Sequence, residues 1–148
     1  MADSTAPVSA SILLADDDPG VLPILAMAFR AAWYRVETAS DGTKALEALE
    51  RGPYDLMVLD ILMPGATGWE VLASAIQRTP PGSPMPRAIL ITGFNAEYVV
   101  DLSILRQEGV AGMLLKPFPA TDILDEIRRV LSMAPILALP KAAQATTA

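Results

Sequence analysis

Short apolar runs alternate along the chain with longer segments in which apolar residues recur every three or four positions. The short runs, bounded by polar residues, are typical of buried strands, and the longer segments are typical of amphipathic helices. The expected strands are 11–15, 34–39, 55–59, 87–91 and 111–115, and the expected helices are 19–32, 43–51, 69–76, 97–107 and 120–132. Asp18 is the expected N-cap of the first helix, because Pro19 suits the first helical position.

The regular alternation of strand and helix predicts the fold. Parallel strands need crossover connections, and right-handed crossovers place helices on both faces of a sheet. We therefore expect a single doubly wound α/β domain with a five-stranded parallel sheet, and 148 residues suffice for one such core. The domain should span 11–132, between a flexible N-terminal segment, 1–10, and a flexible Ala/Pro-rich C-terminal tail, 133–148.

Composition narrows the possible functions. The chain has no cysteine and no histidine, which excludes thiolate catalysis, a Ser-His-Asp triad, an imidazole-ligated zinc site and a phosphohistidine on this chain. The net charge of −6 disfavours direct binding to nucleic acid. The N-terminal residues do not resemble a signal peptide, and no apolar stretch reaches the roughly 18 residues of a membrane span. We expect a cytoplasmic protein without membrane insertion.

Polar side chains follow the apolar runs at the points where ligands bind in open α/β sheets, outside the carboxyl ends of the strands. Asp16 and Asp17 follow the first strand, Asp60 the third, Thr92 the fourth and Lys116 the fifth. Three carboxylates at one edge repel one another and call for a hard divalent cation, most plausibly Mg²⁺. A lysine and a hydroxyl group can bind phosphoryl oxygens. The set therefore suggests phosphoryl transfer to a carboxylate.

Each of these residues has an ordinary structural explanation when it is taken alone. The acids at 16–18 suit a helix cap or a turn, and Asp60 suits a turn before the Pro-Gly pair at 64–65. Thr92 could cap a helix, and Lys116 could be a solvated charge at a strand end. The combination, rather than any single residue, indicates a functional site.

Four segments together resemble the receiver domain of two-component response regulators. They are LLADDDP at 13–19, DLMVLDILMPGATGWEVL at 55–72, ILITG at 89–93 and LLKPF at 114–118. Each motif is weak alone, but their order and spacing fit the family over nearly all of 12–132. The resemblance, which is to chemotaxis-regulator-like receivers that stand alone, implies a flavodoxin-like (βα)5 fold with strand order 2-1-3-4-5.

The resemblance also implies a phosphorelay function. Asp60 would be the phosphoacceptor, taking a phosphoryl group in trans from a sensor histidine kinase or phosphotransfer protein. Thr92 and Lys116 would bind phosphoryl oxygens, Gly93 would leave room for the group, and the Lys116-Pro117 peptide would be cis. Such a domain is regulatory rather than an enzyme, since it catalyses only its own phosphorylation and dephosphorylation, and it changes its binding surface for a downstream protein target.

The metal ligands are carried over from the family in the same way. Asp17 and Asp60 would bind Mg²⁺ directly, and Asp16 would act mostly through water. The backbone carbonyl of Leu62 would complete the protein ligands.

The sequence departs from the family at a switch position. Met113 stands where the family usually has Tyr or Phe, three residues before the lysine, and a thioether side chain can repack there but offers no flat ring. Tyr98 is a weaker candidate for an aromatic reporter of activation. Leu62 and Phe94 are apolar at positions flanking the site, which predicts slow loss of phosphate from Asp60.

Two alternatives stay open from the sequence. The acids at 16–18 also suit a haloacid-dehalogenase-like phosphatase with Asp16 as nucleophile. That interpretation leaves Asp60 unexplained, and the acidic pair such enzymes need after the lysine strand is missing, because Asp122 and Asp125 fall inside a helix. The other alternative is a degenerate receiver that acts by protein binding alone.

Overall fold

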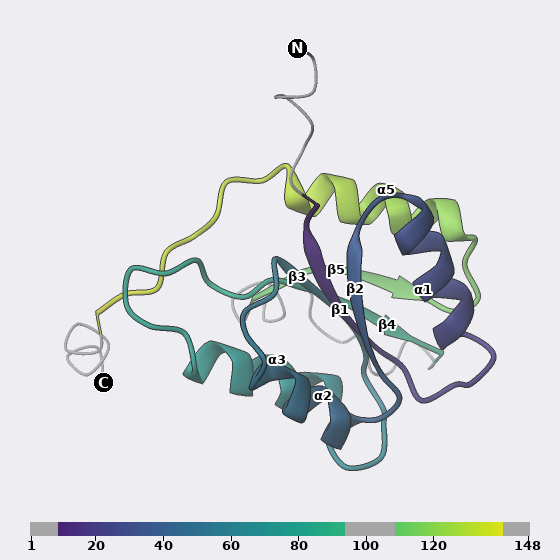
Figure 1. The fold of residues 1–148 in the computed structure, drawn as a ribbon, viewed down its shortest axis with the longest axis horizontal. Coiled ribbons are helices and arrows are strands. Elements are labelled where there is room, and N and C mark those ends of the chain that lie inside the picture. The colour runs from purple at the N-terminus through teal and green to yellow at the C-terminus, as the bar shows by residue number, and fades with distance from the viewer. Residues whose placement is uncertain (1–8, 94–108, 141–148) are drawn as a thin grey trace.

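The computed structural model describes residues 9–93 and 109–140 (Figure 1). Its strands are β1 (Ser11–Ala15), β2 (Arg35–Ala39), β3 (Leu56–Asp60), β4 (Ala88–Thr92) and β5 (Val110–Leu115). Its helices are α1 (Leu22–Ala31), α2 (Gly42–Leu49), α3 (Gly68–Gln77) and α5 (Ala120–Leu131). The helix expected over 97–107 lies outside the described residues.

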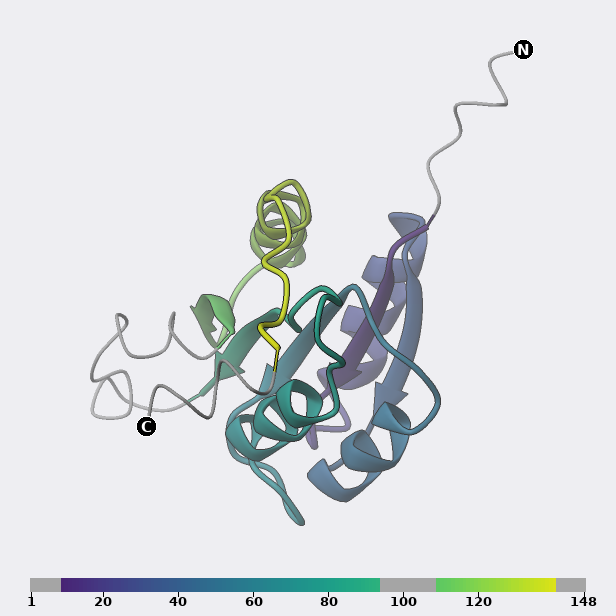
Figure 2. The ribbon, with the colours of Figure 1, turned by 90° about the vertical axis from the view of Figure 1, so that its left-hand side faces the viewer.

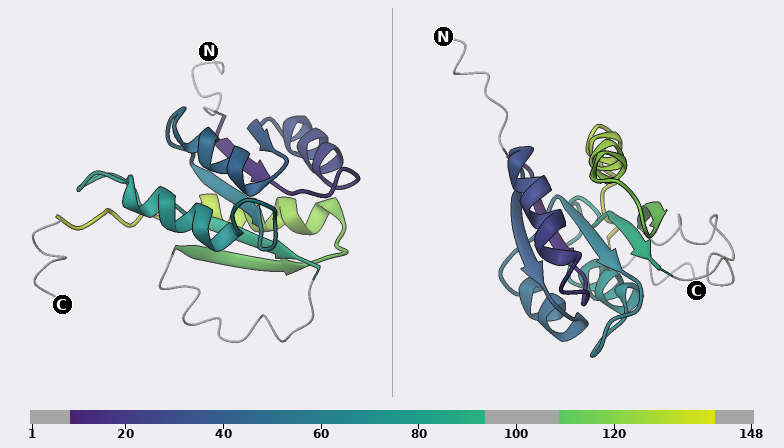
Figure 3. Two further views of the ribbon diagram at one scale, coloured as in Figure 1. Left: turned by 90° about the horizontal axis from the view of Figure 1, so that it is seen from below. Right: turned by 90° about the vertical axis from the view of Figure 1, so that its right-hand side faces the viewer.

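The five strands form one parallel sheet in the order β2-β1-β3-β4-β5. Helices α1 and α5 cover one face and α2 and α3 cover the other, as Figure 1 shows and the side and lower views in Figures 2 and 3 repeat. This confirms the predicted doubly wound, flavodoxin-like fold and its strand order. Strands β3 and β4 are buried along their whole length, which is why they appear in the sequence as continuous apolar runs.

Two hydrophobic clusters fill the space between the sheet and its helices. Alternate residues of a central strand contribute to opposite clusters, as Leu13 does to one and Ile12 and Leu14 do to the other. Phe29 of α1 packs in the cluster beneath α1 and α5, and Leu72 of α3 packs in the cluster beneath α2 and α3. Burial of each such side chain contributes about 1.5–3 kcal/mol. The sheet is therefore a firm base for the polar residues at its edge.

The first helix begins later than the sequence predicts. Its N-cap is Val21, which makes no side-chain capping bond, so the expected capping role of Asp18 is wrong. The Asp18 carboxylate instead accepts a hydrogen bond from the backbone N–H of Gly20 at 2.8 Å, and its carbonyl accepts from the N–H groups of Val21 and Leu22. An aspartate can turn the chain in this way as readily as it can cap a helix. The turn at Asp18–Leu22 therefore belongs to the loop between β1 and α1, which also carries Asp16 and Asp17.

The chain beyond α5 lies alongside the loop between α3 and β4, where the yellow and teal traces run near each other in Figure 1. The N–H of Met85 donates to the carbonyl of Ile136 at 2.7 Å, and the N–H of Gly82 donates to that of Ala138 at 2.9 Å. Ala138 in turn donates to the carbonyl of Ser83. The expected tail is thus hydrogen-bonded to this loop at Ile136 and Ala138. The domain limits at 10 and 132 stay predictions.

Among the residues that the structure describes, no helix has both the length and the apolar character needed to cross a membrane.

Candidate functional site

The order of the strands brings the predicted acidic residues together at one edge of the sheet. Strands β1 and β3 are neighbours, with Ala15 opposite Leu59, so Asp16 and Asp60 follow at adjacent strand ends. One carboxylate oxygen from each of Asp16, Asp17 and Asp60 lies within 4.8 Å of the others. Asp16 is fully buried and Asp60 is 6% exposed, whereas Asp17 faces solvent. The group therefore has two buried carboxylates and one on the solvent side.

Lys116, directly after β5, reaches across β4's end to this group. Its Nζ lies 2.7 Å from Oδ2 of Asp16 and 3.2 Å from Oδ2 of Asp60. The backbone N–H of Lys116 donates to the carbonyl of Thr92 at 2.8 Å, which ties the ends of β4 and β5 together. The Lys116-Pro117 peptide is cis, as the resemblance implies. One ammonium group thus bridges two carboxylates.

The electrostatics of Asp60 follow from this arrangement. The pKa of Asp60 is raised to about 6, first by burial and then by the negative charge of Asp16, while Lys116 opposes both effects. Burial alone would lower the pKa of Lys116, but its contacts with Asp16 and Asp60 outweigh burial and raise it. A single lysine therefore does not balance the charge of the carboxylates around it.

The contacts of Asp16 show that the site can take a cation. Oδ1 of Asp16 accepts a hydrogen bond from the backbone N–H of Asp18 at 2.9 Å. Oδ2 lies beside Lys116, yet it is buried and accepts no well-directed hydrogen bond from the described residues. The Lys116 ammonium is shared between this oxygen and Oδ2 of Asp60, so one cation faces three carboxylates among the described residues. Three carboxylates with one such oxygen fit the oxygen-rich coordination that Mg²⁺ prefers.

The remaining predicted residues lie around this group. Thr92 is buried at the end of β4. A Cβ atom built on Gly93 would meet no atom of the described residues within 4 Å. Leu62 lies two residues after Asp60 with 39% of its surface exposed, and Met113 of β5 packs against the cluster beneath α2 and α3. The metal-binding role of Leu62 and the switch role of Met113 stay predictions. Phe94 and Tyr98 lie outside the described residues.

The loop between Asp60 and α3 is fixed by hydrogen bonds at its far end. The Thr67 hydroxyl accepts from the N–H of Glu70 at 3.1 Å, and the Glu70 carboxylate accepts from the N–H of Thr67 at 3.0 Å. Sequence reasoning missed this reciprocal capping box, although the pattern Thr-x-x-Glu before a helix could have predicted it. The loop also packs against Gly42 of α2, a contact for which the sequence carries no such signal.

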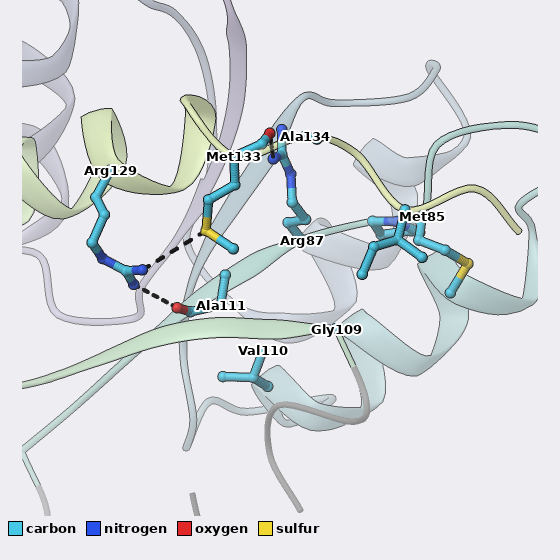
Figure 4. A pocket seen from close by; sticks show the side chains of 10 residues that line it. Met85, Arg87, Gly109, Val110, Ala111, Arg129, Met133 and Ala134 are labelled. Carbon is cyan, nitrogen blue, oxygen red and sulfur yellow. Dashed lines mark hydrogen bonds between the residues drawn. The ribbon is translucent and has the colours of Figure 1, made fainter. Parts of the chain in front are cut away.

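A separate hollow of about 510 Å³ lies at the other end of β4 and β5, where these strands begin (Figure 4). Its charged groups are already engaged. Arg129 donates to the carbonyl of Ala111 at 2.7 Å and pairs with Glu126, and Arg87 donates to the carbonyl of Met133 at 3.0 Å. The candidate site is therefore the acidic edge, not this hollow.

Comparison with known proteins agrees with the geometry. The response regulator receiver domain family matches residues 12–128. The chain therefore belongs to the receiver domain family of two-component response regulators. Membership of this family argues against the haloacid-dehalogenase-like phosphatase that the sequence left open.

Individual relatives show how far the likeness extends. Transcriptional regulatory protein GlrR of Escherichia coli (strain K12) is 35% identical over 108 residues, which cover 73% of this chain but 23% of GlrR. Response regulator receiver protein CpdR of Brucella abortus (strain 2308) is 33% identical over 123 residues, which cover 83% of this chain and 98% of CpdR. This chain thus spans less than a quarter of the length of GlrR and nearly all of the length of CpdR.

A solved structure extends the comparison to the fold. Response regulator protein TrrA from Thermotoga maritima, in complex with Mg²⁺-BeF, is 28% identical with a TM-score of 0.67. The match covers 82% of this chain and 98% of TrrA.

Proposed function

We propose that this domain accepts a phosphoryl group on Asp60 from the phosphohistidine of a sensor histidine kinase or phosphotransfer protein. One observation carries the proposal: the buried Asp60 carboxylate lies 3.2 Å from the Lys116 ammonium and within 4.8 Å of carboxylate oxygens of Asp16 and Asp17, a group that could hold a metal ion. Membership of the receiver family supports the same role. A regulatory domain of this kind would operate in the cytoplasm.

The transfer step follows from the chemistry of Asp60. A carboxylate oxygen of Asp60 attacks phosphorus, and a new O–P bond forms as the P–N bond of the donor breaks. The electron pair of that bond returns to the imidazole nitrogen, which takes up a proton as the neutral donor leaves. Lys116 stabilises the negative charge on the transferred group, and the buried hydroxyl-bearing residue Thr92 would bond another phosphoryl oxygen.

Mg²⁺ is the cofactor that fits the donor set. Asp17 and Asp60 would hold it directly, Asp16 mostly through water, and the carbonyl of Leu62 would complete the protein ligands. When bound, the ion neutralises charge on the carboxylates and on the phosphoryl oxygens. The TrrA structure, which contains Mg²⁺-BeF in a receiver of the same fold, supports this assignment.

Phosphorylation would act on a downstream protein by changing the binding surface of the domain. The group adds about −1.5 to −2 charges at the edge of the sheet. Such a change shifts the balance between two conformations that already exist, and a partner that prefers one of them then binds more tightly. Met113 would repack with Thr92 in this transition, in place of the usual aromatic ring.

A single labelling experiment separates this function from the alternatives. The chain is treated with Mg²⁺ and acetyl phosphate, and the wild type is compared with Asp60→Ala, Asp16→Ala and the control Asp122→Ala, which changes an exposed acid on α5. We expect stoichiometric labelling that Asp60→Ala abolishes and Asp122→Ala leaves unchanged. Repeated turnover that Asp16→Ala abolishes would indicate a phosphatase. No reaction in the wild type would indicate a degenerate receiver.

A further inference from the structure

We propose that the N-terminus of α2 positions the loop that follows Asp60, through Gly42 and Thr43, and so sets the affinity of the site for a divalent cation. The inference rests on the proposed function, because it concerns the carbonyl of Leu62 that this loop would supply. It adds two positioning residues from a helix that contributes no group to the site.

The first contact joins Gly42 to the apex of the loop. The N–H of Gly42 donates to the carbonyl of Pro64 at 2.9 Å. A Cβ atom built on Gly42 would lie 2.0 Å from the carbonyl oxygen of Ala66 and 2.5 Å from its nitrogen. The two backbones therefore touch with no side chain between them. No other residue type fits at position 42 without moving the loop.

The second contact joins Gly65 to Thr43. Gly65 has a φ of +86°, and a Cβ atom built on it would lie 2.1 Å from Oγ1 of Thr43. The start of α2 is itself anchored, since the Asp41 carboxylate caps the N–H of Lys44 at 2.8 Å and Gly42 is buried. The loop thus rests on a fixed helix end at two successive points.

The loop is also held where it joins α3. The N–H of Gly68 donates to the carbonyl of Ile61 at 2.9 Å, and a Cβ atom on Gly68 would lie 2.5 Å from the carbonyl oxygen of Asp60. Leu62 therefore lies between one anchor on α3 and another on α2. Because ligand affinity falls when a group is displaced by as little as about 1 Å, loosening or pushing the α2 anchor should weaken cation binding.

The chain offers a matched control for this idea. Gly82 has a φ of +82°, close to that of Gly65, but a Cβ atom built on it would meet no atom of the described part of the chain within 4 Å. Gly65→Ala and Gly82→Ala therefore introduce the same backbone strain, and only Gly65→Ala pushes against α2. A purely structural role would lower the melting temperature in both variants and leave the affinity for Mg²⁺ alone.

The test is calorimetric titration of the wild type and both variants with Mg²⁺, alongside their melting temperatures without the ion. We expect the melting temperature to fall in both variants, and further in Gly65→Ala because of its contact with Thr43, with Mg²⁺ affinity about tenfold weaker in Gly65→Ala and unchanged in Gly82→Ala. Equal affinities for Gly65→Ala and Gly82→Ala would overturn the inference.

Thr43→Ala alone keeps the inference testable if Gly65→Ala does not fold. Thr43 is exposed, so this variant should keep its stability while its Mg²⁺ affinity falls measurably. If the Mg²⁺ affinity of Thr43→Ala is unchanged while the wild type is still phosphorylated, the inference is overturned and the proposed function stands. A wild type that neither binds Mg²⁺ nor accepts a phosphoryl group would instead overturn the proposed function, and this inference with it.

Discussion

Asp60 combines burial with two neighbouring charges of opposite sign, Asp16 and Lys116. Its pKa of about 6 leaves the carboxylate ionised at neutral pH, as a nucleophile must be, while burial keeps that ionised form unfavourable. The domain therefore holds an unfavourable negative charge at Asp60, the proposed acceptor residue. Binding of a cation would relieve it.

The raised pKa of Asp60 predicts how the stability of the fold depends on pH. Because the pKa of Asp60 is raised above its ordinary value of 3.8, the folded state binds a proton more tightly than the unfolded state, and stability falls as pH rises from about 4 through about 6. The variant Asp60→Asn does not lose stability in this way, because an asparagine at position 60 does not titrate. In metal-free buffer its advantage in unfolding free energy over the wild type should grow by about 1 kcal/mol between pH 5 and pH 7.5, as measured by urea denaturation. An advantage that stays constant with pH would show that the pKa of Asp60 is not raised by folding.

Leu62 is predicted to slow the loss of phosphate from Asp60. Leu62 is apolar, comes two residues after Asp60 and is 39% exposed, so it would shield a phosphoryl group on Asp60 from the attacking water. Leu62→Asn should shorten the half-life of the phosphorylated protein, and Leu62→Met, which stays apolar, should not. The half-life is measured by following the intact mass after the phosphodonor is removed. Equal half-lives for the two variants would show that Leu62 has no shielding role.

At the scale of elements, the end of α1 departs from ordinary helix chemistry. Trp33, just after the helix, has a φ of +73°, a conformation in which glycine is usual. The N–H of Trp33 donates to the carbonyl of Arg30, and the N–H of Tyr34 donates to the carbonyl of Phe29. Trp33 is 83% exposed and so gains little from packing. The left-handed conformation costs a residue with a Cβ atom about 1–2 kcal/mol.

Trp33→Gly should therefore stabilise the protein. We expect a gain of about 0.5–1 kcal/mol in unfolding free energy, since the relief of strain exceeds the greater freedom of glycine in the unfolded chain. Trp33→Ala keeps a Cβ atom and serves as the control, with no comparable gain. Thermal denaturation of the wild type, Trp33→Gly and Trp33→Ala measures the change in stability that each substitution causes. A Trp33→Gly variant less stable than Trp33→Ala would mean that the freedom of glycine in the unfolded chain outweighs the strain at this position.

The sequence indicated the elements well where burial is complete and less well where loops begin. The strands β1, β3 and β4 are continuous apolar runs because both faces of the sheet are covered, so their positions could be predicted. The start of α1 could not be predicted, because an aspartate suits a turn as well as a cap, and here the Asp18 carboxylate accepts from the N–H of Gly20 in a turn. Asp60 and Thr92 prove to be the last residues of their strands rather than the first loop residues.

At the scale of the whole molecule, the segment 133–140 lies along the loop after α3. Ala138 is buried there, with hydrogen bonds to Gly82 and Ser83, whereas the adjacent Leu137 is 55% exposed. Ala138→Asp would place a charge in this contact and should lower the melting temperature. It should also speed hydrogen exchange at the N–H groups of Gly82 and Met85. Leu137→Asp adds the same charge outward and should change neither, and equal effects of the two variants would contradict the packing described.

The site residues could be predicted from sequence because a general rule places them. Ligand groups in open α/β sheets lie after the carboxyl ends of the strands, so Asp16, Asp60 and Lys116 could be assigned to one site before their distances were known. The contact between Gly42 and the loop near Ala66 could not, since it joins distant segments and depends on how α2 lies against the sheet. In the sequence, Gly42 after the N-cap Asp41 is typical of an ordinary turn, so nothing there indicates the contact.

The position of the phosphoryl group on the chain decides whether Asp60 is the acceptor. The protein is treated with Mg²⁺ and acetyl phosphate, the acyl phosphate is trapped by reduction with borohydride, and the reduced residue is located by tandem mass spectrometry. We expect a single reduced residue at position 60, absent when Mg²⁺ is removed by a chelator. Reduction at Asp16 or Asp17 with none at Asp60 would contradict the proposed role of Asp60.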